Sequence, residues 1–321
     1  FEYLISAANI TDADNRYYEQ RTNSYFGRLK YNYDNRYLFA FTARYDGSSK
    51  FGPNNKYGFF PAVSAAWRIS EENFFDVNAI SEFKLRASYG LTGNDGIPAF
   101  SYLALYTAGA NYNNEPGVRP SQLPNPDLKW ESTSQLNFGI NLGFLKDRIT
   151  FVADAYAKKT TDLLLDRPIS ATSGYTFITA NIGELQNMGL EIGLTTDNIK
   201  KERFSWRSVL NYSMNRNKVT KLYNGQPILD IGRGNNSVIE GEPLGVFYGY
   251  VSQGVDPSTG DIVFKDINGD GEITSADRTV IGNPNPDFIG GFNNIVNYRQ
   301  FSLTFFMQFS YGNDIFNGSR I

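Results

Sequence analysis

Apolar and polar residues alternate along much of this chain, in runs of roughly ten residues. In the run at 37–45, Tyr37, Phe39 and Phe41 fall on one face, whereas Thr42 and Arg44 fall on the other. This pattern predicts a β-strand with one apolar and one polar face, because successive side chains of a strand point to opposite sides. The other runs that predict strands lie near 25–33, 59–69, 83–91, 135–144, 149–155, 188–195, 204–215, 288–298 and 301–310.

The predicted strands, about ten in number, are long enough to cross a bilayer at a tilt. A soluble β-sandwich would show the same alternation, since it buries its apolar face and exposes its polar face to water. The strand pattern therefore predicts an all-β protein and leaves both architectures open.

The connections between the predicted strands separate the two architectures. Short and long connections alternate along the chain. Outer-membrane barrels have tight turns on one side of the membrane and long loops on the other, whereas sandwiches follow no such rule. This alternation favours a large antiparallel transmembrane barrel. The short connections lie near 34–36, 71–81, 146–148, 198–203 and 299–300, and the long ones near 46–57, 92–131, 160–182 and 216–287.

Aromatic residues gather near the ends of the first predicted strands. Tyr25, Tyr33, Tyr37, Tyr45 and Phe59 all occupy such positions. Two aromatic girdles at the membrane interfaces would produce this placement. Tyr and Phe are also good strand formers wherever a strand lies, so both interpretations stand.

The composition agrees with strands rather than helices in a membrane. Aromatic residues make up 15% of the chain, yet its mean hydropathy is a polar -0.39. A membrane-spanning helix needs about 18 or more apolar residues in succession, and the sequence contains no such run. The chain begins at Phe1 without an initiator Met and ends at Ile321, and we interpret it as a fragment of a longer protein.

The chain lacks the residues on which most familiar enzymes depend. It contains no cysteine and no histidine, which removes thiolate nucleophiles, disulfides and the usual zinc ligands and general bases. We therefore expect that it is not an enzyme. Its formal net charge of -3 also argues against a nucleic-acid partner, because neutralising phosphates requires a surplus of Lys and Arg.

The longest connection contains a motif that resembles a calcium-binding loop. Asp266, Asn268 and Asp270 occupy the first, third and fifth positions of the loop, and Glu272 would contribute its carbonyl at the seventh. Asp277 stands at the twelfth position, where a longer Glu is usual. We expect a structural calcium that braces an outer loop. The alternative is a set of Asx and glycine turns that needs no ion.

The order of motifs along the chain resembles the barrel of SusC/RagA-type TonB-dependent transporters. Five segments carry the resemblance and together span nearly the whole chain. They are Tyr37–Phe51, Tyr57–Trp67, Leu85–Asn94, Asn187–Ile192 and Asp266–Asp277, the last followed by Ile281-Gly-Asn-Pro-Asn-Pro286.

The resemblance implies an outer-membrane importer of Bacteroidota with a barrel of roughly 22 strands. It implies a lumen filled by an N-terminal plug, energy from the TonB complex and a SusD-like lipoprotein as an outer lid. The imported solute would be an oligosaccharide or, in some members, a peptide, and the surrounding partner would be outer-membrane lipid. Residues 1–321 would form a partial barrel domain, without the plug, carrying long outer loops at about 92–131, 160–182 and 216–287. The loop at Asp266, Asn268, Asp270 and Asp277 matches the family pattern, whereas no substrate-binding residue can be assigned.

The competing hypothesis is a secreted soluble β-sandwich or adhesin that binds glycans through its loops. It accounts for the alternating strands and for the loop aromatics. It does not account for the alternation of short and long connections.

Overall fold

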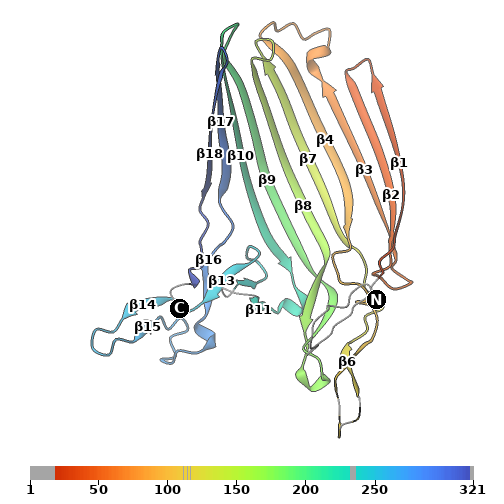
Figure 1. The fold of residues 1–321 in the computed structure, drawn as a ribbon, viewed down its shortest axis with the longest axis vertical. Helices are drawn as coiled ribbons and strands as arrows, with labels where there is room; N and C mark the ends of the chain where they lie inside the picture. Colours follow the sequence, from red (N-terminus) through yellow and green to blue (C-terminus); the bar gives the residue numbers. More distant parts are fainter. Residues whose placement is uncertain (1–18, 111, 114, 116, 232–235, 319–321) are drawn as a thin grey trace, which may run out of the picture.

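The computed structural model describes residues 19–318 apart from 111, 114, 116 and 232–235. Its main feature is a curved antiparallel sheet of ten strands, in the order β1-β2-β3-β4-β7-β8-β9-β10-β17-β18 (Figure 1). Because this order follows the chain, each strand turns back beside the one before it. The prediction of an all-β antiparallel architecture with about ten long strands is confirmed.

The ten strands differ in length, and those in the middle of the sheet are the longest. Their bounds are β1 Thr22–Tyr33, β2 Tyr37–Ser48, β3 Tyr57–Arg68, β4 Ile80–Asn94, β7 Glu131–Phe144, β8 Ile149–Pro168, β9 Phe177–Lys201, β10 Phe204–Lys221, β17 Phe288–Tyr298 and β18 Phe301–Tyr311.

Short strands in the long connections form three small sheets. Strands β5 (Leu105–Ala108) and β6 (Val118–Gln122) make one hairpin, and β14 (Ser252–Val255) and β15 (Ile262–Phe264) make another. A four-stranded sheet contains β11 (Ile228–Ile231), β12 (Asn236–Val238), β13 (Val246–Gly249) and β16 (Thr279–Gly282). Four 3-10 turns complete the described elements: η1 (Ile69–Glu71), η2 (Ala171–Ser173), η3 (Tyr223–Gly225) and η4 (Ser275–Asp277).

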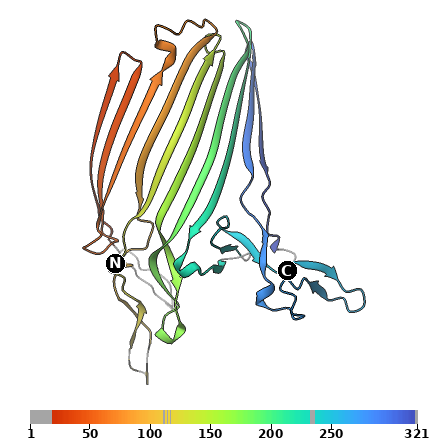
Figure 2. The same ribbon diagram turned by 180° about the vertical axis from the view of Figure 1, so that it is seen from behind.

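All the long connections lie at one end of the main sheet and the short ones at the other (Figures 1 and 2). Asp34 and Asn35, in the turn between β1 and β2, both have positive φ, at 51° and 53°. Turns of this hand match the right-handed twist of the strands that they join, and Asp and Asn tolerate the conformation well. Long and short connections therefore alternate in the sequence because successive connections lie at opposite ends of the sheet.

One predicted connection is wrong. The segment 160–182 was expected to be irregular, but β8 continues to Pro168 and β9 begins at Phe177, which leaves only 169–176 outside the strands. Asp162 has a φ of 58°, and the pairing of β8 with β9 shifts register between Thr160 and Leu163. Such a bulge moves side chains to the other face, so the period-two pattern is interrupted although the strand continues.

Buried apolar cores lie at the long-connection end of the main sheet rather than beneath its strands. One contains Phe51, Ile97 and Leu128, and the other Val219, Leu222 and Val238. Contacts between the described elements fall almost entirely between hydrogen-bonded neighbours. No second sheet packs over the main one within the described ranges, so the β-sandwich hypothesis is wrong. No helical segment there is long and apolar enough to span a membrane.

Candidate functional site: the two faces of the sheet and the outer loops

The apolar face of the sheet carries two rows of aromatic side chains. Tyr25, Tyr45 and Phe59 are opposite one another on β1, β2 and β3 near the long connections, and they are exposed. A second row contains Tyr33, Tyr37 and Trp67 beside the short connections. The structure therefore places these aromatics in two bands at opposite ends of the strands.

The spacing of the two aromatic rows is close to the height of a membrane's apolar band. Tyr25 and Tyr33 are separated by eight residues on β1, which is about 26 Å along the strand at roughly 3.3 Å per residue. A strand tilt of about 35–45° reduces this to about 19–22 Å along the membrane normal. An outer-membrane barrel has an apolar band of about 25 Å between its aromatic girdles. Halfway between the rows lie Leu29, Phe41 and Val63, with 70%, 50% and 51% of their surfaces exposed. Exposing this much apolar surface to water would be unfavourable, whereas lipid would cover it.

Two members of the aromatic row beside the short connections have their polar groups hydrogen-bonded. Trp67 Nε1 donates to Glu72 Oε1 at 2.8 Å, and the Tyr37 hydroxyl donates to the same oxygen at 2.6 Å. The hydrogen bonds from Tyr37 and then Trp67 hold the pKa of Glu72, which lies in the connection, below its ordinary value. Rings with one apolar side and one hydrogen-bonded tip suit the boundary between lipid and water.

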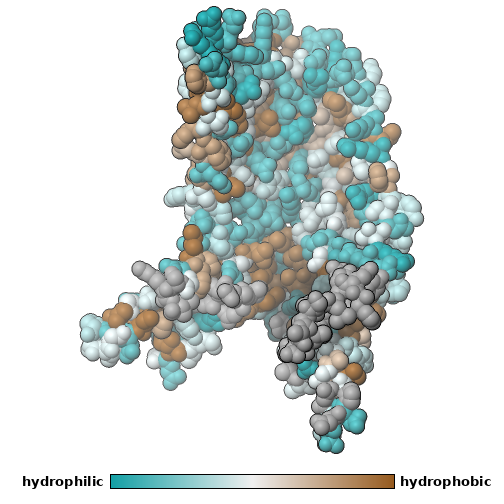
Figure 3. All heavy atoms as spheres, viewed as in Figure 1, coloured by the Kyte–Doolittle hydropathy of each residue, from teal (hydrophilic) through white to brown (hydrophobic). Residues whose placement is uncertain are grey.

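The opposite face of the sheet is hollowed and largely hydrophilic (Figure 3). Two depressions of about 590 Å³ and 500 Å³ adjoin this face. The first is bordered by cationic residues, Arg28, Lys30 and Arg86, and the second by Glu191. Asp154 borders both.

A polar network at the middle of this face depends on a glycine. Arg86 on β4 donates to Asn141 Oδ1 on β7 and to Asp154 Oδ2 on β8, both at 2.9 Å. Gly139 lies in register between Arg86 and Asp154. A Cβ atom there would overlap the Asp154 carboxylate and the Arg86 guanidinium. The missing side chain of Gly139 therefore lets the ion pair reach across an intervening strand.

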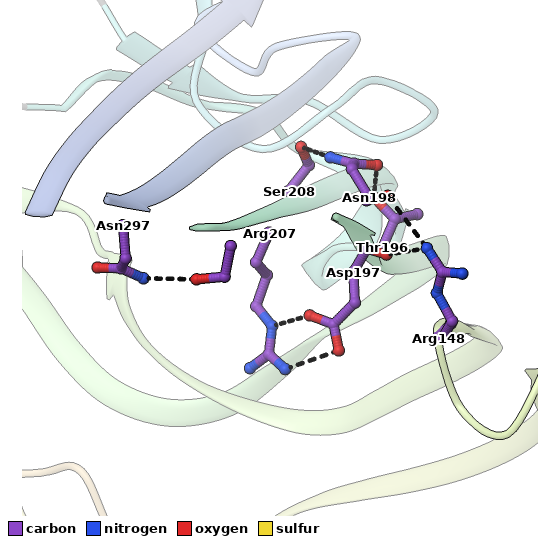
Figure 4. A network of polar contacts seen from close by, with 8 residues as sticks. Arg148, Thr196, Asp197, Asn198, Arg207, Ser208 and Asn297 are labelled. Carbon is purple, nitrogen blue, oxygen red and sulfur yellow. Dashed lines mark hydrogen bonds and ion pairs between the residues drawn. The ribbon is translucent and has the colours of Figure 1, made fainter. Parts of the chain in front are cut away.

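A second network lies at the short-connection end (Figure 4). Arg207 on β10 and Asp197 on β9 form two hydrogen bonds of 2.6 and 3.1 Å. Arg148, in the turn immediately before β8, donates to the backbone carbonyls of Asp197 and Asn198. Paired hydrogen bonds between Arg and a carboxylate fix geometry, so these contacts tie three strands together at their ends.

The calcium-like loop joins β15 to β16 and turns its side-chain oxygens inward. Asp266 accepts hydrogen bonds from the backbone N–H groups of Gly269 and Gly271, at 2.6 and 2.8 Å. The Asn268 side chain accepts from the Asp270 N–H, and the Asp270 side chain accepts from the Glu272 N–H. These are Asx-type turns, which close the loop through its own backbone.

Asp277 is buried and closes the same loop from its far end. One carboxylate oxygen accepts from the Ile267 N–H at 2.9 Å and the other from the Thr274 N–H at 2.8 Å. The backbone N–H of Thr274, followed by that of Ile267, lowers the pKa of Asp277, and the nearby Asp266 side chain acts in the same direction. Residues 266 and 277, the first and twelfth loop positions, therefore lie side by side.

The side-chain oxygens of the loop accept backbone N–H groups. In the part of the chain that the structure describes, no three carboxylate, histidine or cysteine side chains form a group that could hold a metal ion. The arrangement of the loop fits turns that need no ion, and calcium binding stays a prediction. Glu272 would contribute only its backbone carbonyl to a bound ion.

The comparison with known families decides what kind of sheet this is. Residues 2–246 match the sequence model of the family described as TonB dependent receptor-like, beta-barrel. The chain belongs to the TonB-dependent receptor β-barrel family. Within that family it is of the SusC/RagA type, as its relatives show.

Three relatives illustrate the match to these receptors. TonB-dependent receptor P3 of Formosa agariphila is 40% identical over 320 residues, which are 92% of this chain and 32% of the relative. TonB-dependent receptor SusC of Bacteroides thetaiotaomicron is 37% identical over 315 residues, covering 91% and 31%. The solved RagAB peptide transporter is 28% identical with a TM-score of 0.84, covering 91% of this chain and 34% of that one. The chain thus spans about a third of the length of the curated relatives that it matches.

Two features of the site were missed in the sequence. The partners of Arg86 lie on strands 55 and 68 residues away, so alternation alone places Arg86 on the polar face without naming them. Arg167 and Tyr223, which meet at the outer end of β8, belong to segments read as irregular connections. A stretch of basic and aromatic residues in a loop is too common to single out such a pair.

Proposed function

We propose that this chain forms part of the barrel wall of a SusC/RagA-type transporter. The transporter would import oligosaccharides or peptides across the bacterial outer membrane, with energy delivered by TonB. The observation that carries this proposal is one uninterrupted antiparallel sheet with opposite faces: an exposed apolar face between two aromatic rows, and a hollowed polar face. In this proposal each long strand crosses the membrane once, so the chain is a multi-pass membrane protein.

The apolar face supports contact with lipid. Many large apolar side chains on the main strands are at least half exposed, among them Leu29, Phe41, Val63, Phe138 and Leu303. Exposed apolar patches beyond a few hundred Å² are rare on soluble monomers. A lipid bilayer removes the same surface from water without a second protein layer.

The polar face supports a wet or plugged lumen. It carries Asn, Ser, Arg and acidic residues that pair mainly with one another, as Arg86 does with Asn141 and Asp154. Large outer-membrane transporters enclose a lumen filled by a plug. A plug region, which would also contact TonB, has no counterpart among the described residues.

The partner and the solute follow from the relatives. The solved relative RagAB is a peptide transporter, and the curated relative SusC is a TonB-dependent receptor. We extend to this chain a SusD/RagB-like lipoprotein partner on the outer face and a solute that is either an oligosaccharide or a peptide. The long connections, gathered at one end of the sheet, are where such a partner and solute would arrive.

Uptake by living cells tests the proposed function. The gene for the full-length transporter would be deleted, and uptake of labelled peptide and oligosaccharide mixtures would be measured with and without a proton uncoupler. We expect the deletion to abolish uptake of one class of solute, and the uncoupler to do the same in the parent strain. Unchanged uptake in the deletion strain for both classes would contradict import, and uptake that survives the uncoupler would contradict TonB energy.

Biochemical behaviour tests the membrane and partner claims separately. We expect the full-length protein to fractionate with the outer membrane, to need detergent for a monodisperse state, and to copurify with a lipoprotein. A protein that stays monomeric in buffer without detergent would contradict the barrel. Recovery of the transporter from native membranes without a lipoprotein would contradict the partner and leave the barrel intact.

A further inference from the structure

A small cavity lies at the outer end of the sheet, where the chain after β10 folds back against β8 and β9. Its volume is about 270 Å³, and its walls are Arg167, Ile182, Leu222, Tyr223, Gln226 and the adjoining Pro227–Ile228. Leu222 belongs to one of the two buried apolar cores and Ile228 packs against it, so this core forms one side of the cavity. Both ribbon views place β11, which begins at Ile228, beside the ends of β8 and β9 (Figures 1 and 2).

Arg167 supplies the positive charge of this cavity. Its guanidinium lies over the ring of Tyr223, with Cζ 4.5 Å from the ring centroid. Its Nε atom is sealed from solvent and has no hydrogen-bond partner. Stacking on an aromatic ring holds a guanidinium flat and in place, but it does not satisfy its N–H donors.

Other arginines of the sheet show what Arg167 lacks. Arg86, Arg207 and Arg216 each approach a carboxylate oxygen, at 2.9, 2.6 and 2.8 Å. Among the described residues, no carboxylate forms an ion pair with Arg167. The carboxylate of its neighbour Asp166 instead accepts a hydrogen bond from Thr179 at 2.7 Å.

An unpaired, partly buried cation beside a cavity favours an anionic ligand. A charge that is partly removed from water without a partner is unfavourable, and an anion in the cavity would compensate it. The planar guanidinium matches the two oxygens of a carboxylate, and the side-chain amide of Gln226 brings a further donor to the same cavity. Apolar side chains such as Ile182 and Leu222 form the remaining walls, which suits a small apolar group attached to the carboxylate.

We propose that this cavity binds a carboxylate group of the imported solute, with Arg167 as its cationic partner. The carboxylate would belong to a peptide C-terminus or to an acidic sugar. The origin of the ligand rests on the proposed import function, whereas the binding itself does not.

Calorimetric titration of the full-length transporter in detergent tests the proposal. The peptide probes are Ala-Ala-Leu with a free C-terminus and the same peptide as its amide. The sugar probes are digalacturonate and the neutral disaccharide galactobiose. We expect at least one carboxylate probe to bind, and its neutral counterpart to bind at least tenfold more weakly. Binding of the free peptide alone would indicate that the carboxylate comes from a peptide, and binding of digalacturonate alone that it comes from an acidic sugar. Either result supports carboxylate binding in the cavity.

Variants locate the binding. Arg167→Gln removes the charge at similar side-chain length and should weaken binding of the carboxylate probe at least tenfold. Arg167→Lys keeps the charge but not the forked guanidinium, so its affinity for the probe should fall less. Arg299→Gln is the matched control, because Arg299 also lies over a tyrosine, Tyr298 at 5.4 Å, but in a short turn at the opposite end of the sheet. Its affinity should be that of the parent protein.

Three outcomes overturn the proposal. The first is that neither carboxylate probe binds at millimolar concentration. The second is equal binding of a charged probe and its neutral counterpart, and the third is unchanged affinity in Arg167→Gln. If the Arg167 variants do not fold, Gln226→Leu removes the second donor of the cavity and leaves Arg167 in place. It should weaken binding of the same carboxylate probe, and unchanged affinity would overturn the proposal. Carboxylate binding by a protein that imports nothing would refute the proposed function and leave the site standing.

Discussion

Replacing Val63 by arginine places a charge at the centre of the apolar face. Val63 lies on β3 in the row midway between the two aromatic bands, and 51% of its surface is exposed. The aromatic Phe59 lies four residues away on the same face, or about 13 Å along the strand. In the proposed orientation Val63 therefore faces the middle of the bilayer.

The magnitude follows from this depth. An arginine on the lipid face of an outer-membrane barrel is unfavourable by about 2–4 kcal/mol at the midplane and by about 0–1 kcal/mol near the interface. Val63→Arg should therefore lower the free energy of unfolding by about 2–4 kcal/mol, and Phe59→Arg by about 1 kcal/mol or less. Ser64 follows Val63 and points to the polar face, opposite Ala40 and Ser88. Ser64→Arg should change the free energy by about 0.5 kcal/mol or less.

Guanidinium titration of the full-length transporter refolded into phospholipid vesicles measures all three variants. The expected order of destabilisation is Val63→Arg, then Phe59→Arg, then Ser64→Arg. Equal losses for Val63→Arg and Ser64→Arg would refute the assignment of the two faces. A loss at Phe59 as large as that at Val63 would refute the depth assigned to the aromatic row.

Four further predictions concern the polar face and the loops. Leu128→Ala, at a fully buried core position, should destabilise the outer connections by about 2–5 kcal/mol and speed their proteolysis. The half-exposed Leu103→Ala serves as control, and equal protease resistance would count against the core. Gly139→Val should destabilise the sheet by about 1–3 kcal/mol when unfolding is measured in vesicles. Gly27→Val, where a Cβ atom would meet open space, should not destabilise it. Equal destabilisation by the two variants would disprove the requirement for glycine at 139. Calcium should release heat on titration and protect the loop from proteolysis, and Asp277→Asn should remove both effects; no heat and no chelator sensitivity would end the calcium hypothesis. The pKa of Asp277 is lowered from 3.8 in the folded loop. Its carboxylate should therefore stabilise the loop fully above pH 3.8, and this stabilisation should be lost as the pH falls towards the folded pKa. Proteolysis of the loop across about pH 2–6 would measure the loss.

Pattern reading predicts the long strands well because lipid and lumen impose opposite demands on alternate residues. Along β2, the apolar set at Tyr37, Phe39 and Phe41 faces one way throughout, and the structure pairs it with equivalent sets on both neighbours. The turn at Asp34 and Asn35 is equally readable, because few residues accept its positive φ.

The same reasoning fails where a strand departs from regular pleating. The bulge near Asp162 reverses the faces of β8, so a long hairpin looks like an irregular loop in the sequence. Contacts between distant segments are also beyond a single sequence. The meeting of Arg167 with Tyr223 depends on how the chain after β10 folds back over β8, and no local pattern encodes that path.

The calcium-like loop lies between these extremes. Its spacing of oxygen-bearing residues predicts a compact turn, and the structure closes that turn through Asp266 and Asp277. The same side chains can either accept backbone N–H groups or bind a cation. The sequence therefore predicts the shape of the loop but not its ligand.

A nitroxide scan along β2 tests the membrane-spanning wall most directly. The chain has no cysteine, so single cysteines can be introduced one at a time from Tyr37 to Tyr45 in the full-length transporter, after any cysteine outside this chain has been replaced. We expect collisions with oxygen, which concentrates in lipid, to be high at 37, 39, 41, 43 and 45 and low at the residues between them. The oxygen signal should peak at 41 and fall towards both aromatic rows. Uniform accessibility along the strand, or high collision rates with a water-soluble nickel complex at 39 and 41, would contradict a lipid-facing wall.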